Sequence, residues 1–203
     1  MAQIRPVRQK MRIAILWAAG IAVLLAAILT RPILTDQTFW GSAIRLVGTF
    51  ILIAAFVGRL WAILYIGTQK NQQVIQSGPY SMVRNPLYFF SFLGVIGALL
   101  LMGGLTLTLA GGTLFFAIFY LTAQGEAVFL QSKFGPDFDA YAARVPLFIP
   151  KPSLFQGSEI NSVGIPALKS TFWDGLVFLA IIPFAEILNW LRSVSDFQLF
   201  DLY

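Results

Sequence analysis

The chain has 203 residues, of which 58% are hydrophobic and only 11% are charged. A soluble domain normally carries about 25% charged residues, so this composition excludes an ordinary soluble protein and indicates an integral membrane protein. The chain contains no cysteine and no histidine, which excludes disulfides, thiolate nucleophiles and the commonest side-chain metal ligand, and we expect no metal site. The net charge of +5 is interpreted through membrane topology, and no nucleic-acid partner is expected.

Five apolar segments divide the chain. A transmembrane helix needs about 20 residues, and the five segments approach or exceed that length. The sequence therefore predicts an all-α integral membrane fold, a compact bundle of about five transmembrane helices, with residues 1–203 as a single membrane domain. The predicted spans are residues 13–30, 42–66, 87–102, 105–122 and 172–191.

The first span follows a basic terminus that holds Arg5, Arg8, Lys10 and Arg12. Basic residues beside a span favour the cytoplasmic side, so we expect a cytoplasmic N-terminus, and an inner-membrane protein if the source is bacterial. A cleaved signal peptide is the rival interpretation. The apolar segment is long for a signal peptide, and Arg31 follows it in place of a small-residue cleavage site.

The second span completes the first section of the domain, residues 1–66, and contains two arginines. Arg45 lies near the outer end and is expected to snorkel outward. Arg59 lies about seven residues, or about 10 Å of helix, from the inner end. An arginine inside a membrane is a functional candidate, and we assign Arg59 a possible substrate contact. The alternative is that its long stem reaches the cytoplasmic headgroups.

A polar stretch, residues 77–88, connects the second and third spans on the side expected to be cytoplasmic. Gly78-Pro79 predicts a turn, and Pro86 suits the first turn of the helix that follows. Tyr80 and Tyr88 flank Arg84-Asn85, so hydrogen-bonding groups gather at the mouth of a membrane helix. The rival interpretation is a membrane-surface loop with an aromatic belt and a snorkelling arginine.

Gly103-Gly104 is the turn signal between the third and fourth spans, which we expect to form a tight hairpin. Small residues allow close helix approach in membranes. Four glycines in this hairpin are therefore assigned to packing, with the opening of part of a pocket as the alternative: Gly94, Gly97, Gly111 and Gly112.

Charged residues return in the window 123–152, where Phe134-Gly135-Pro136 predicts a turn. We expect a helix that leaves the membrane, this turn, and a cytoplasmic amphipathic helix that stops before Val145-Pro146. Residues 151–171 are predicted to form a polar loop, either a lid or a disordered connection. Residues 172–203 hold the last apolar helix and the tail, with a kink expected at Pro183. Glu186 is interpreted as a group near the surface rather than a buried acid.

Two motifs taken together resemble a known family. The first is the Gly-Pro-Tyr turn followed by Arg84-Asn85-Pro86-Leu87-Tyr88. The second is Glu126 followed by Leu130, Phe134-Gly135, Tyr141 and Val145-Pro146. In this order, with one hydrophobic hairpin between them, they resemble the integral membrane methyltransferases of the isoprenylcysteine carboxyl methyltransferase and phospholipid methyltransferase type. The resemblance covers residues 65–150 and makes 67–150 a methyltransferase-like core.

The resemblance implies a helical bundle that binds S-adenosyl-L-methionine on its cytoplasmic side and admits a lipophilic substrate from the bilayer, with membrane lipids as partners. Glu126 would face the cationic end of the cofactor, and Arg84 would assist catalysis or hold a phosphate. The remaining residues implied to bind the cofactor are Val74, Ile75, Tyr80, Asn85, Pro86, Leu87 and Tyr88.

The chain departs from the family pattern at three positions. The family usually has histidine where this chain has Asn85, a second glutamate where it has Ala127, and a substrate-binding arginine where it has Thr122. Asparagine cannot act as a base. The change at Thr122 argues against a substrate with an isoprenylcysteine-like carboxylate.

The function that we expect is direct methyl displacement onto a lipid or a lipophilic small molecule. A carboxylate nucleophile would need no base, whereas an amine would pass its proton to Glu126 or a tyrosine. Two other classes stay open. A small transporter or channel subunit would line a polar path with Arg59, Asp174 and Glu186. A non-catalytic relative would bind ligand without turnover or would act as a scaffold for partners, given Asn85 and Ala127.

Overall fold

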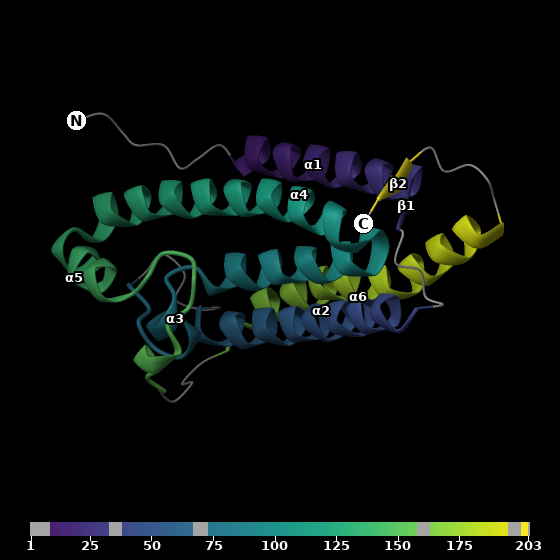
Figure 1. Ribbon diagram of the computed structural model, residues 1–203. Helices are drawn as coiled ribbons and strands as arrows, with labels where there is room; N and C mark the ends of the chain where they lie inside the picture. Colours follow the sequence, from purple (N-terminus) through teal and green to yellow (C-terminus); the bar gives the residue numbers. More distant parts are fainter. Residues whose placement is uncertain (1–8, 33–37, 67–72, 158–162, 195–199, 203) are drawn as a thin grey trace.

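The computed structural model describes residues 9–32, 38–66, 73–157, 163–194 and 200–202. Its elements follow one another along a helical bundle (Figure 1). They are α1 (Gln9–Leu29), β1 (Thr30–Pro32), α2 (Phe39–Ile66), α3 (Pro79–Met82), α4 (Pro86–Phe134), α5 (Pro136–Arg144), a 3-10 turn η1 (Pro152–Leu154), α6 (Ile165–Val194) and β2 (Phe200–Leu202).

The described residues contain four helices that are long and apolar enough to cross a membrane, together with the shorter apolar helix Pro86–Met102. This confirms the predicted all-α integral membrane bundle of about five transmembrane helices. The strands were not predicted. They are three residues each and pair in parallel, with Thr30 opposite Phe200, and Figure 1 shows them away from the end that holds α3 and α5.

Helix α4 is a hairpin rather than one rod. Gly104 has φ 72° and ψ −163°, a conformation that residues with a Cβ rarely adopt, so the chain reverses there as predicted. The two arms pack side by side. The ring centroids of Phe92 and Phe116 lie 5.7 Å apart, and a Cβ built on Gly112 would come within 2.8 Å of the Ile96 side chain.

Helices α2 and α4 cross closely in the middle of the bundle. A Cβ on Gly97 would lie 2.7 Å from the carbonyl oxygen of Gly48 and 2.9 Å from the backbone nitrogen of Leu52. These backbone contacts confirm the predicted packing role of Gly97. The surrounding core includes Leu52, Leu99, Leu101, Ala185 and Leu188, all buried.

The predicted polar loop 151–171 is shorter in the structure, because α6 begins at Ile165. Its first turn is closed by a 2.8 Å hydrogen bond from the Leu168 N–H to the Gly164 carbonyl. Pro166 suits a first helical turn, and no glycine or proline lies between it and Trp173. The polar residues in this segment are therefore part of the helix, which begins earlier than predicted. Residues 158–162, where we expected a lid or a disordered connection, lie outside the described residues.

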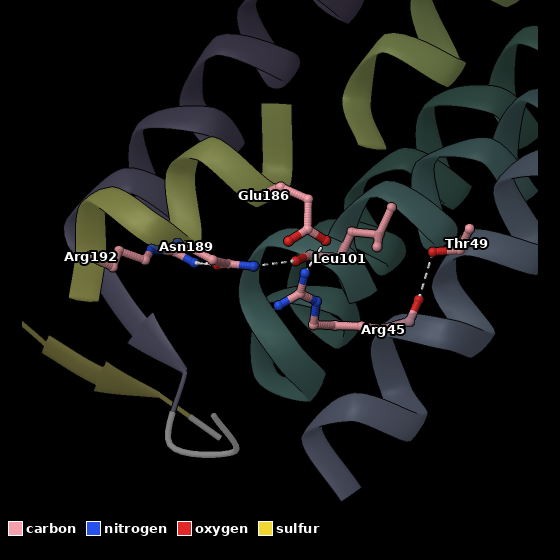
Figure 2. A network of polar contacts seen from close by, with 6 residues as sticks. All are labelled: Arg45, Thr49, Leu101, Glu186, Asn189 and Arg192. Carbon is pink, nitrogen blue, oxygen red and sulfur yellow. Dashed lines mark hydrogen bonds and ion pairs between the residues drawn. The ribbon is translucent and has the colours of Figure 1, made fainter. Parts of the chain in front are cut away.

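A polar network joins α2, α4 and α6 at the end of the bundle remote from α5 (Figure 2). Arg45 forms an ion pair with Glu186, whose side chain is 59% exposed. Arg192 is buried and donates to Asn189 Oδ1 at 2.9 Å and to the carbonyls of Met102 and Ala27. Glu186 is therefore a surface group, as predicted, and Arg45 is paired with it rather than simply extended to the headgroups.

Candidate functional site

A cavity of about 160 Å³ opens at the end of the bundle that holds α3 and α5. Its lining comes from α1, the end of α2, α3 with the segments on either side of it, both arms of α4, and α5. A second hollow of about 430 Å³ shares Gln73, Val74 and Phe134 with it and extends it past the α4–α5 turn. The lining residues of the first cavity are Arg12, Ile66, Gln73, Val74, Ile75, Tyr80, Arg84, Asn85, Pro86, Leu87, Tyr88, Glu126, Leu130, Phe134, Phe138 and Tyr141.

The unequal arms of α4 bring the two predicted motifs together. The second arm, Gly104–Phe134, has 31 residues and spans about 46 Å at 1.5 Å per residue, more than the roughly 30 Å of the hydrocarbon core. It therefore runs past the start of the first arm. Tyr88 stacks on Phe119 with 6.2 Å between ring centroids, and Glu126 lies about two turns further along the same arm, beside the Tyr88 hydroxyl.

The Tyr88 hydroxyl connects a carboxylate and a guanidinium across the cavity. Its hydroxyl donates to Glu126 Oε2 at 2.6 Å and accepts a hydrogen bond from Arg12 Nη1 at 2.9 Å. The Arg12 guanidinium carbon also lies 5.8 Å from the Tyr88 ring centroid. Hydrogen bonds to ionised groups are stronger than neutral ones, so this chain of contacts fixes the Tyr88 ring and the Glu126 carboxylate in place.

The polar stretch 77–88 is fastened to the segment that follows α5. The Gly78 N–H donates to the Gln156 carbonyl at 2.7 Å, and the Arg84 N–H donates to the Pro146 carbonyl at 2.9 Å. Asn85 contributes as well, because its Nδ2 donates to the Leu147 carbonyl at 3.2 Å. The stretch is therefore a braced wall of the cavity.

Tyr80 stands inside this wall rather than in an aromatic belt at the membrane surface. Its side chain is 5% exposed, and the Tyr141 hydroxyl donates to its carbonyl at 2.8 Å. The Tyr80 hydroxyl is buried and has no hydrogen-bond partner among the described residues. A buried hydroxyl without a partner is costly, and Tyr80 is one of the residues that line the cavity.

Burial also changes the acid–base behaviour of the wall. It raises the pKa of Tyr80 and of Tyr141 above the ordinary range of a phenol, so both stay neutral at physiological pH. Partial burial lowers the pKa of Arg84, and the nearby Tyr141 and Tyr120 act in the opposite direction. Because the pKa of an arginine lies far above neutral pH, Arg84 remains a cation.

The structure brings together nine of the residues singled out from the sequence: Val74, Ile75, Tyr80, Arg84, Asn85, Pro86, Leu87, Tyr88 and Glu126. It does not bring Arg59 into this cavity. Arg59 hydrogen-bonds Ser91 Oγ and lies 5.5 Å from the Phe178 ring centroid, between α2, α4 and α6. A substrate contact by Arg59 stays a prediction.

Sequence reasoning missed Arg12, Ile66, Gln73 and Phe138 as lining residues, and it quoted Leu130, Phe134 and Tyr141 as motif residues without assigning them to the site. Arg12 is the most important of them, because it adds a second guanidinium. The sequence predicted that the basic terminus and the polar stretch 77–88 both lie on the cytoplasmic side of the membrane. This shared location was the one available indication that Arg12 reaches the cavity.

The arrangement suits a ligand that carries both signs of charge. Glu126 can accept hydrogen bonds from a cation, while Arg84 and the Leu87 N–H at the start of α4 can meet an anion. The rings of Tyr80 and Tyr88 offer faces for a cation or a flat base. The chemistry of the lining is therefore that of a zwitterionic ligand with an aromatic part.

Comparison with known proteins gives two kinds of match. The profile of the family described as phospholipid methyltransferase matches residues 37–137. A protein-S-isoprenylcysteine O-methyltransferase of Schizosaccharomyces pombe is 30% identical over 81 residues, 40% of this chain and 34% of that protein. No solved structure matches.

Two bacterial relatives align over most of their length. A nickel-cobalt-cadmium resistance protein, NccN, of Alcaligenes xylosoxydans is 35% identical over 169 residues, 82% of this chain and 78% of that protein. A cobalt-zinc-cadmium resistance protein, CzcN, of Cupriavidus metallidurans is 32% identical over 165 residues, 81% of this chain and 76% of that protein. With the family profile and the two motifs, these matches lead to one conclusion: the chain belongs to the phospholipid methyltransferase and isoprenylcysteine carboxyl methyltransferase-like family of integral membrane proteins.

Proposed function

We propose that this protein is a membrane methyltransferase that binds S-adenosyl-L-methionine in the cavity and transfers its methyl group to a lipid or a lipophilic small molecule. One observation carries the proposal. Tyr88 and Glu126, which belong to the two separate family motifs, share one cavity and are joined by a 2.6 Å hydrogen bond.

The residues present fit the cofactor. Glu126 suits its ammonium, and the Leu87 N–H at the start of α4 suits its carboxylate, with Arg84 beside it. The Tyr80 hydroxyl, buried without a partner among the described residues, supplies a donor for the adenosine part. The Tyr88 ring offers a face to the sulfonium.

When bound, S-adenosyl-L-methionine supplies an activated methyl group: the lone pair of the acceptor bonds to the methyl carbon, and the electron pair of the C–S bond returns to sulfur. The protein must then align donor and acceptor and keep water out. Leu130, Phe134 and Phe138 give the cavity an apolar side for this purpose. Glu126 is the group placed to take a proton from an amine acceptor, and a carboxylate acceptor needs no base.

The cavity is proposed to face the cytoplasm, where S-adenosyl-L-methionine is available. Basic side chains gather at its end of the bundle, and such residues favour the cytoplasmic side of a membrane. They include Arg12, Arg84, Lys133, Arg144 and Lys151.

Calorimetry with S-adenosylhomocysteine tests the proposal on the full chain in an uncharged detergent. We expect saturable binding that Tyr88→Ala weakens strongly and Arg59→Ala leaves within about twofold, because Tyr88 lines the cavity and Arg59 does not. Thermal melts of both variants control for misfolding. No binding to the wild-type chain would contradict the proposal, and equal losses in the two variants would contradict the placement of the pocket.

The names of the two bacterial relatives favour a related role in metal resistance. This chain contains no histidine and no cysteine, the side chains that best bind nickel, cobalt, zinc and cadmium. We therefore infer that any contribution to resistance runs through methylation of a membrane component. Deleting the gene and restoring it with wild type or Glu126→Gln tests this: growth in nickel or cobalt should recover with the wild type alone. Equal recovery with both would refute the link.

A further inference from the structure

Arg12 belongs to a part of the chain outside the family match, which begins at residue 37, yet its side chain lines the same cavity as Glu126. It reaches Tyr88, 76 positions away along the chain. Helix α1 therefore contributes one charged group to the site. Many of the apolar side chains of α1 are exposed, among them Ile13, Ile15 and Trp17.

A snorkelling arginine would behave differently. The ordinary role of a basic residue at this position is to extend outward to the headgroups of bulk lipid. Arg12 is instead turned toward Tyr88, where Nη1 donates to the hydroxyl at 2.9 Å. A guanidinium has five N–H donors, and that hydrogen bond is its single one to the described residues. Most of its donors remain available to a ligand at the border between the cavity and the bilayer.

The charge of the filled cavity favours an anionic acceptor. Among the described residues that line the cavity and its extension, Arg12 and Arg84 are cations and Glu126 and Asp137 are anions, so the lining alone is balanced. S-adenosyl-L-methionine adds one positive charge, because it has an ammonium, a sulfonium and one carboxylate. Gathering like charges in a site shielded from water is unfavourable, so an acceptor with a negative group would balance the filled site.

We propose that Arg12 binds an acidic group of the methyl acceptor, so that the substrate is an amphiphile with a phosphate or carboxylate head. This proposal rests on the proposed function above. It assigns the two arginines to different partners: Arg84 lies by the start of α4, where the carboxylate of the cofactor is expected, and Arg12 lies by the Tyr88–Glu126 pair on the lipid-facing helix. Arg12 is a substrate-binding residue in this scheme and takes no part in the methyl transfer itself.

The test uses the full chain in dodecyl maltoside, saturated with S-adenosylhomocysteine. Dodecyl phosphate and dodecanoate are titrated as acidic probes, and dodecanol is the uncharged control. We expect Arg12→Gln to weaken binding of the acidic probes about tenfold or more, in line with the loss of a charge-assisted hydrogen bond. Arg12→Lys keeps the charge and should restore part of the affinity. Lys169→Gln removes an exposed charge outside the cavity and should change nothing.

A second readout separates this proposal from the proposed function. Arg12→Gln should keep its affinity for S-adenosylhomocysteine within about threefold and should raise KM for the acceptor more than it lowers kcat. Equal binding of dodecanol, equal binding of the acidic probes by Arg12→Gln, or a loss confined to S-adenosylhomocysteine would each overturn the assignment while the proposed function stands. Failure of the wild-type chain to bind S-adenosylhomocysteine would overturn both. The tighter of the two acidic probes identifies the head group as phosphate or carboxylate.

Discussion

The carboxylate of Glu126 lies beside Tyr88 in the cavity, where it can meet a cationic ligand. Glu126→Gln removes this charge while it keeps the size of the side chain and an oxygen that can accept from the Tyr88 hydroxyl, now 2.6 Å away. A hydrogen bond between an ammonium and a carboxylate contributes about 1.5–3 kcal/mol. Since 1.4 kcal/mol is a factor of ten, Kd for S-adenosylhomocysteine should rise roughly 10- to 100-fold.

The assay is isothermal calorimetry on full-length protein in dodecyl maltoside, with a thermal melt of each variant. Glu186→Gln is the matched control, because it makes the same chemical change at the remote end of the bundle, where the side chain is 59% exposed and paired with Arg45. An exposed pair contributes about 0–1 kcal/mol, so neither fold nor affinity should change much. Unchanged affinity in a well-folded Glu126→Gln variant would refute the assigned role of Glu126.

Three further predictions concern the scaffold. Gly97→Ala places a Cβ 2.7 Å from the Gly48 carbonyl oxygen and should cost about 1–3 kcal/mol in stability; Gly20→Ala, with nothing within 4 Å, should not, and equal thermal melts would contradict the packing account. Tyr141→Phe removes a buried donor to the Tyr80 carbonyl; it should lower stability by about 1–3 kcal/mol and weaken S-adenosylhomocysteine binding, whereas a wild-type melt would speak against the braced wall. Burial raises the pKa of both tyrosines above the value of about 10 that a phenol has when unfolded. The stability that their neutral forms provide is therefore present below pH 10 and is lost as the pH rises further. Phenolate absorbance between pH 9 and 11 should be the same in folded Tyr141→Phe and folded wild type, and a smaller amplitude in the variant would count against burial.

Local signals in the sequence were sufficient for the bundle and the hairpin. Gly103-Gly104 marks the reversal because a positive φ favours glycine, and the structure has it at Gly104. The turn before Pro136 was also predicted, and Gly135 has φ 55° there. The start of α6 was misplaced because polar residues after Pro166 are compatible with a helix once it has begun.

Of the residues that line the cavity, the sequence predicted only those in or near the two motifs. Arg12 was missed because the contact between α1 and Tyr88 depends on how distant helices pack, and no periodicity in the sequence records that. This contact also changes one argument drawn from the sequence. Thr122 counted against an acceptor with a carboxylate, since no arginine stands there; in the structure, Arg12 supplies a guanidinium to the site from another helix.

The most direct test of the central claim is methyl transfer. Purified protein is incubated with methyl-labelled S-adenosyl-L-methionine and a total lipid extract, and the products are extracted into organic solvent and identified by mass spectrometry. We predict a labelled lipophilic product that forms with the wild-type chain and is strongly reduced with Glu126→Gln. A wild-type chain that binds S-adenosylhomocysteine and yet labels no extractable product would contradict the account.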